Sequence, residues 1–139
     1  MVTRRLESKS AFVSVHDNGI VEVCLKPNWS EPDTPEVAID GAKTLKKAVD
    51  GNICGILTHA PSLYVKKEFL EAYSSINIGH IASAILVQSV GSRIFANLAL
   101  KFIKPIPKKR IFTNPDKAKS WLLEQIALAK QKAAPTTNS

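Results

Sequence analysis

Two short apolar runs constrain the fold of this chain more than any other feature. They are ICGILT at residues 53–58 and ASAILVQ at residues 82–88. Runs that are almost continuously apolar are typical of central strands covered on both faces of a sheet. Segments with helical apolar spacing follow them, at about 65–76 and about 92–103. Alternating strands and helices indicate an α/β sheet that is largely parallel.

The remaining elements have recognisable start signals. Residues 11–26, AFVSVHDNGIVEVCLK, predict two strands joined at DNG, because Asn and Gly tolerate positive φ. TPE at 34–36 and TNPD at 113–116 predict helix starts, and the two helices are expected to reach Val49 and about Lys130. The stripe expected on the last helix consists of Ala118, Trp121, Leu122, Gln125, Ile126 and Leu128. A short strand is predicted at 109–112.

The predicted fold class is therefore α/β. The order is β-β-α-β-α-β-α-β-α, with a mostly parallel or mixed sheet flanked by helices. A length of 139 residues suits one domain. We expect a flexible N-terminal segment at 1–10, a single domain at 11–130 and a disordered tail at 131–139.

The charge of the chain limits the classes of partner. The net charge is +7 and the isoelectric point about 9.5, but the basic residues are spread along the sequence. Their densest group is Lys101, Lys104, Lys108, Lys109 and Arg110. Few aromatic residues alternate with them, so a stacking surface for nucleic acid is not indicated. Residues 81–103 are too interrupted by polar residues for a membrane span, and MVTRRLESKS lacks the apolar stretch of a signal peptide. We expect a cytoplasmic protein.

No motif for catalysis or metal binding is visible in the sequence. His16, His59 and His80 have no metal-ligand spacing, and we expect them to be structural or exposed. Cys24 and Cys54 lie in apolar strand-like runs and are expected to be buried free thiols. There is no GxSxG, GxGxxG or phosphate-binding loop. We therefore predict no catalytic residue, no metal, no cofactor and no enzymatic activity.

The element order, together with AILVQSVGSRIFANLALKF at 84–102 and RIFTNPDKAKSWL at 110–122, resembles the STAS-type fold. This fold is that of sulfate transporter and anti-sigma-factor antagonist domains. The chain looks closest to small, functionally uncharacterised STAS-like bacterial proteins of the Bacteroidetes type, over about residues 10–130. The resemblance implies a compact regulatory or protein-interaction domain that dimerises or docks on a partner, and that is not an enzyme.

The chain departs from that family at the regulatory loop. Anti-sigma-factor antagonists carry an Asp-Ser-Ser/Thr-Gly-type motif there, whose hydroxyl is phosphorylated. The corresponding loop here is HAPSLYVKK, without the acidic residue or the glycine. Ser62 is retained only as a weak candidate for a regulatory site.

The segment QSVGSR, which follows the second apolar run, allows two interpretations. Ser89, Gly91, Ser92 and Arg93 could bind an anion at a helix N-terminus, near the carboxyl ends of parallel strands where open α/β sheets bind ligands. Alternatively, Ser89 or Ser92 caps the helix, Gly91 permits close packing and Arg93 is solvated or paired.

The helix expected at 92–103 has an apolar stripe wider than one sheet contact needs. This width indicates a homodimer or partner surface at Phe95, Leu98, Ala99 and Phe102. The leading functional hypothesis is a non-enzymatic STAS-like interaction module that self-associates. The alternative is a domain that binds a small molecule, a phosphorylated ligand or a lipid headgroup, and nucleic-acid binding ranks third.

Overall fold

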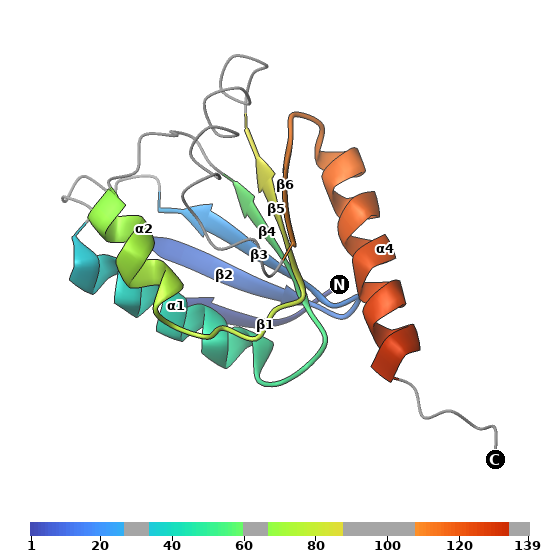
Figure 1. The fold of residues 1–139 in the computed structure, drawn as a ribbon, viewed down its shortest axis with the longest axis horizontal. Coiled ribbons are helices and arrows are strands. Elements are labelled where there is room, and N and C mark those ends of the chain that lie inside the picture. Colours follow the sequence, from blue (N-terminus) through green and yellow to red (C-terminus); the bar gives the residue numbers. More distant parts are fainter. Residues whose placement is uncertain (27–33, 60–66, 88–107, 134–139) are drawn as a thin grey trace.

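The computed structural model describes residues 1–26, 34–59, 67–87 and 108–133. Within them, six strands form one mixed sheet whose spatial order is the chain order, β1 to β6 (Figure 1). The strands are β1 (Val2–Glu7), β2 (Ala11–His16), β3 (Ile20–Leu25), β4 (Gly55–His59), β5 (Ala82–Leu86) and β6 (Lys108–Phe112). The three helices of this part of the chain are α1 (Pro35–Val49), α2 (Lys67–Ser74) and α4 (Pro115–Ala133). The predicted α/β class is confirmed.

The sheet has an antiparallel half and a parallel half. β1, β2 and β3 pair antiparallel, whereas β3, β4, β5 and β6 pair parallel. One apolar cluster fills the space between the sheet and α1, and a second lies between the sheet and α4. Figure 1 accordingly shows α1 and α2 together on one side of the sheet and α4 on the other. The sheet is the middle of three layers.

The hairpin between β2 and β3 turns at the predicted DNG signal. Gly19 has φ +92°, which a side chain rarely adopts, and its N–H donates to the carbonyl of His16 at 3.2 Å. The Asn18 side chain accepts from the N–H of Ile20 at 3.0 Å. The turn fixes the register in which Val13 and Val21 point to the α1 layer.

Helix α1 begins at its predicted cap. The hydroxyl of Thr34 accepts from the N–H of Val37, and Pro35 occupies the first turn, where its missing N–H costs nothing. The helix ends at Asp50 in the left-handed region, whose N–H donates to the carbonyl of Lys46. Its buried face consists of Val37, Ala38, Ala42, Leu45, Ala48 and Val49.

Helix α4 begins at Asn114, whose side chain accepts from the N–H groups of Asp116 and Lys117. Its buried residues are Ala118, Leu122 and Ile126. A Cβ on Gly55 of β4 would lie 2.9 Å from Leu122 Cδ2, so this glycine permits the close approach of α4 to the sheet. The stripe predicted for this helix is wrong at one position, because Leu128 is 44% exposed. Leu128 lies two residues after Ile126, which places it well off the buried face.

The two chain ends differ from expectation where the structure describes them. Val2–Glu7, predicted as part of a flexible segment, forms β1 because its backbone pairs with β2. The order therefore begins with three strands, and the flexible-segment prediction is wrong for these residues. α4 continues to Ala133, three residues into the predicted tail. The remainder of the tail, 134–139, lies outside the described residues.

Other predicted boundaries shift by a few residues. The strand predicted at 53–58 is β4, Gly55–His59, and the one predicted at 82–88 is β5, Ala82–Leu86. The helix predicted at about 65–76 is α2, Lys67–Ser74. The helix predicted at 92–103 lies outside the described residues.

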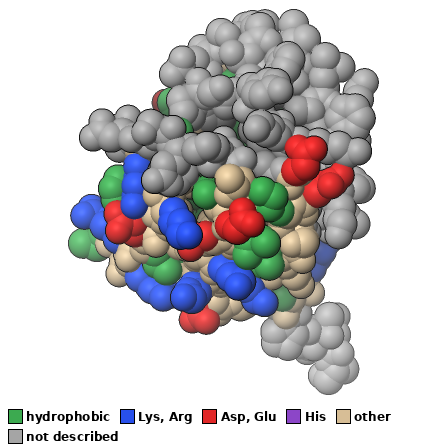
Figure 2. All heavy atoms as spheres, turned by 90° about the vertical axis from the view of Figure 1, so that its left-hand side faces the viewer, with side chains coloured by type: hydrophobic (Ala, Val, Ile, Leu, Met, Phe, Trp, Pro, Cys, Tyr) green, Lys and Arg blue, Asp and Glu red, His purple; other side chains and the backbone are tan. Residues whose placement is uncertain are grey.

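The surface of the described residues fits the dispersed charge of the sequence. On the side of the molecule that Figure 2 shows, Lys and Arg side chains are interspersed with Asp, Glu and apolar side chains. No single-sign field is visible on that side. Among the residues that the structure describes, no helix is long and apolar enough to cross a bilayer.

Candidate functional site

Helix α4 covers only part of its side of the sheet. It packs on β4, β5 and β6 and reaches the amino end of β3, where a Cβ on Gly19 would lie 3.3 Å from Ile126 Cδ1. At its other end, Trp121 packs against Phe112 at the end of β6, with ring centroids 5.7 Å apart. The helix thus crosses the sheet diagonally, from the carboxyl end of β6 to the amino ends of β4 and β3. The carboxyl ends of β3 and β4 lie beyond it.

We call the part of this sheet face that α4 does not cover the open face. It includes Phe12, His16, Glu22, Cys24 and His59. These side chains share one face because strand residues alternate: their neighbours Val13, Val15, Val21 and Val23 pack in the α1 layer. The carboxyl ends of parallel strands are also where open α/β sheets bind ligands.

Three polar side chains from three adjacent strands meet on the open face. The Glu22 carboxylate contacts His16 Nε2 through Oε1 at 3.0 Å and His59 Nε2 through Oε2 at 2.5 Å. An ionised carboxylate only accepts hydrogen bonds, so both imidazoles donate to it through Nε2. The three side chains are half-buried, which makes these charge-assisted contacts stronger than at a fully exposed site.

The charge of Glu22 is set by opposing effects. Burial raises the pKa of its carboxyl, but hydrogen bonds from His59 and His16 and the charges of these imidazoles together outweigh burial. The pKa of Glu22 is therefore held below its ordinary value, and the group is an anion near neutral pH.

Cys24 places a sulfur beside this trio. It stands two residues after Glu22 on the same face of β3 and pairs directly with His59 of β4. Burial and the neighbouring Glu22 charge raise the pKa of the Cys24 thiol. A ligand atom from each of Glu22, Cys24 and His59 lies within 4.8 Å of the other two. The three residues could therefore hold a metal ion.

The two cysteines differ in burial. Cys54 is buried, as predicted, but Cys24 is exposed, so the prediction of two buried thiols is wrong for Cys24. The cause is tertiary: Cys24 lies near the end of β3, beyond the reach of α4.

An aromatic side chain borders the cluster. Phe12 of β2 pairs with Cys24 across the strands and is 46% exposed. The ammonium of Lys26 lies 5.4 Å from the centre of its ring and forms an ion pair with Glu7 at 3.1 Å. An exposed aromatic ring with a polar rim is typical of a protein-contact surface.

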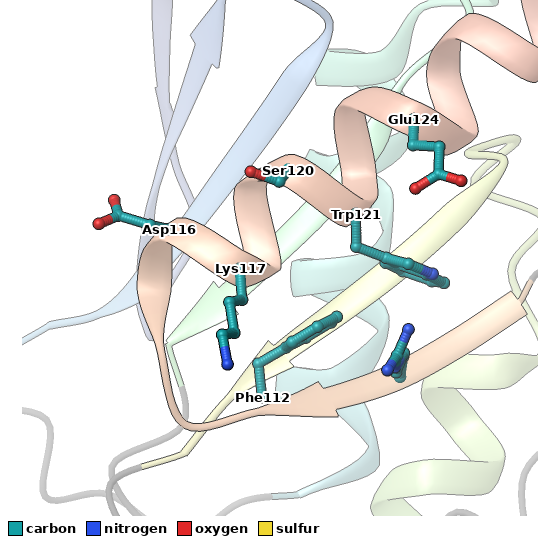
Figure 3. Close-up of a pocket in the computed structure, with 7 residues that line it drawn as sticks. Phe112, Asp116, Lys117, Ser120, Trp121 and Glu124 are labelled. Atoms are coloured by element: carbon teal, nitrogen blue, oxygen red, sulfur yellow. The ribbon is translucent and has the colours of Figure 1, made fainter.

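A shallow groove of about 350 Å³ lies at the junction of β6 and α4 (Figure 3). The Phe112 and Trp121 rings face each other there, with the guanidinium of Arg110 5.1 Å from the Phe112 ring. Its rim combines Lys117 with Asp116 and Glu124. Charges of both signs around a widely open groove do not select one class of ligand, so this groove ranks below the open face.

The third histidine is separate from the cluster. His80 precedes β5, and its Nδ1 is buried with no hydrogen-bond partner among the described residues. Burial, followed by the charge of Lys109, lowers the pKa of His80 to about 4.

None of the residues of this cluster was among the site residues predicted from sequence. The anion-binding turn Ser89, Gly91, Ser92 and Arg93, the interface residues Phe95, Leu98, Ala99 and Phe102, and Ser62 lie outside the described residues. Of the basic group, Lys108, Lys109 and Arg110 belong to β6.

Sequence reasoning missed the cluster because it depends on strand register. The three histidines were expected to be structural or exposed, and no spacing rule links His16 with Glu22 and His59. The one available signal was the alternation Ile20, Glu22, Cys24, which places an acid and a thiol on the same strand face. The histidine partners come from β2 and β4, which only the pairing of the strands reveals.

No family model matches the chain, and neither the curated proteins nor the solved structures contain a match to it.

Proposed function

We propose that the chain is a non-enzymatic regulatory or protein-interaction module with a STAS-like fold, and that it self-associates through the open face. The observation that carries the proposal is the exposed Phe12 ring, which lies beside a half-buried polar cluster at the carboxyl ends of β3 and β4. The α/β architecture is compatible with the resemblance noted in the sequence. Aromatic side chains with a polar rim are enriched at protein interfaces, which supports a partner surface here.

The size of the solution particle tests self-association. We expect wild type to be a dimer by light scattering, and Phe12→Glu to be a folded monomer, because a charge would be desolvated at the interface. Leu128→Glu is the matched control: Leu128 is 44% exposed against 46% for Phe12, but it lies on α4. The control should keep the mass of wild type.

A third variant compares the open face with the interface predicted from sequence. Phe95→Glu/Phe102→Glu changes only that predicted surface. If this variant alone dissociates the dimer, the interface belongs to the segment 92–103 and the open-face proposal is wrong. A monomeric wild type contradicts self-association altogether, and turnover of a substrate that is abolished by Glu22→Gln contradicts the non-enzymatic assignment.

A second candidate function is binding of a small phosphorylated ligand or lipid headgroup. The favouring observation is that β5, which precedes the QSVGSR segment, pairs with the strand that ends at His59. A ligand at this edge would be close to the imidazole of His59. Calorimetric titration with inorganic phosphate tests it: binding should weaken in Arg93→Ala, and binding unaffected by that change removes this candidate.

A further inference from the structure

We propose that Glu22, Cys24 and His59 bind a divalent transition-metal ion of the zinc class on the open face. The inference goes beyond the proposed function, since one chain supplies all three ligands and no partner is needed. It stands on the placement and chemistry of three side chains that the sheet brings together.

The geometry is close to that of a metal centre. The three ligand atoms lie within 4.8 Å of one another. In a tetrahedral zinc site with bonds of roughly 2.0 to 2.3 Å, the ligand atoms are about 3.3 to 3.8 Å apart. The Glu22 and His59 atoms, now 2.5 Å apart, would separate by about 1 Å, and the more distant ligand atoms would approach by about 1 Å. Both changes are within reach of side-chain rotation, because the backbone positions are already set by adjacent strands.

The backbone arrangement accounts for this proximity. Glu22 and Cys24 are two residues apart on β3 and therefore share a face. His59 is the register partner of Cys24 on β4. The ion would replace the direct hydrogen bond between Glu22 and His59. Binding displaces the proton that His59 Nε2 donates to Glu22 and releases the thiol proton of Cys24, so that the imidazole nitrogen and the thiolate each offer a lone pair.

The donor set selects the class of ion. A thiolate and an imidazole disfavour Ca²⁺ and Mg²⁺, which take oxygen ligands. One sulfur, one nitrogen and one oxygen suit a borderline ion such as Zn²⁺. Carboxylate and thiolate together supply two negative charges against the two positive charges of the ion. Three protein ligands leave the fourth position to water.

His16 is a positioning residue for this site. Its Nε2 contacts the Oε1 atom of Glu22 at 3.0 Å and so orients the carboxylate, leaving Oε2 on the His59 side. Outer hydrogen bonds of this kind hold metal ligands in place, and their loss typically costs about 10- to 100-fold in affinity.

The experiment is a titration of the untagged, reduced full-length chain with Co²⁺, followed by competition with Zn²⁺. We expect one equivalent to bind, with visible bands of a tetrahedral ion and a near-ultraviolet thiolate-to-metal band that Zn²⁺ abolishes. Cys24→Ser should lose the thiolate band, and His59→Gln should weaken binding by about ten-fold or more. Circular dichroism verifies that each variant is folded.

The matched controls change a cysteine and a histidine elsewhere in the fold. Cys54→Ala and His80→Gln change a thiol and an imidazole that are not part of the open face, and both should bind as wild type does. For the positioning role, His16→Ala should weaken binding while His16→Gln, which keeps a donor, should restore part of it.

Each result decides the proposal. It is overturned if Co²⁺ and Zn²⁺ do not bind in the micromolar range, if the thiolate band persists in Cys24→Ser, or if it disappears in Cys54→Ala. The mass measured by light scattering is a separate quantity. A monomer that binds the ion contradicts self-association alone, and a dimer that binds none contradicts the metal site alone.

Discussion

The two parts of the α4-side sheet face differ in what covers them and in the chemistry they carry. Under α4, Leu57, Ala82 and Ala84 are fully buried and pack against Leu122. Beyond the helix, Glu22 and His59 are half-buried, and Cys24 and Phe12 are exposed. Both parts belong to one sheet with continuous pairing. The comparison shows that the diagonal path of α4 decides which part of this face is buried core and which part is accessible to a ligand or partner.

The largest loss of stability is expected where α4 packs on the sheet. Leu122→Ala removes a fully buried side chain and leaves a cavity, and we expect a loss of about 2 to 5 kcal/mol in the free energy of unfolding. Leu123→Ala, one residue away but 40% exposed, should change it by less than about 0.5 kcal/mol. Urea denaturation measures both. Equal effects would show that α4 does not pack on the sheet by the face described.

Two glycine substitutions test the close approach of α4 to β4. Gly55→Ala places a Cβ against the fully buried Leu122 and should cost about 1 to 3 kcal/mol through overpacking. Gly41→Ala in α1 meets nothing within 4 Å and should stabilise by about 0.5 to 1 kcal/mol, because alanine favours helix. The two variants thus have opposite signs in the same denaturation assay. A stable Gly55→Ala would mean that the helix can move away from the sheet.

His80, whose Nδ1 has no hydrogen-bond partner among the described residues, should make stability depend on pH. The pKa of His80 is lowered to about 4 in the folded chain, from an ordinary value of 6.5. The unfolded state therefore binds a proton first, so stability is complete above pH 6.5 and is lost as pH falls toward 4. We expect a loss on the order of 1 to 2 kcal/mol across this range. His80→Gln should reduce this dependence of stability on pH, as measured by denaturant titrations at a series of pH values. An unchanged profile contradicts the assignment.

The cluster on the open face should also make stability depend on pH, with a smaller effect and at lower pH than His80. Since the pKa of Glu22 is held below 4.5 in the folded chain, its contribution is present above that value and is lost as pH falls through the folded pKa. Glu22→Gln removes the charge and should cost about 1 kcal/mol at neutral pH. The loss should shrink only as pH falls through the folded pKa of Glu22, which lies below 4.5, because wild type then becomes protonated as well. A loss that is the same at neutral pH and in acid, where the carboxyl is protonated, would show that the charge contributes nothing.

Much of the fold was predictable because its signals are local. The DNG turn, the caps at Thr34 and Asn114 and the buried runs of β4 and β5 depend on neighbouring residues, and the structure confirms each element. β1 was not predicted, because VTRRLE has little apolar alternation and is a strand only through its pairing with β2. Burial of individual residues, such as the exposure of Cys24 and Leu128, depends on where α4 lies.

By itself, the sequence determined the α/β class, most of the described element positions and the dispersed positive charge. Only the tertiary structure brought His16, Glu22, Cys24 and His59 together, from three strands separated by a turn and by the α1 segment. The physical reason is that periodicity and capping act within a few residues, whereas a site across strands requires their register and the path of the covering helix. The chemistry of the open face is therefore a property of strand pairing.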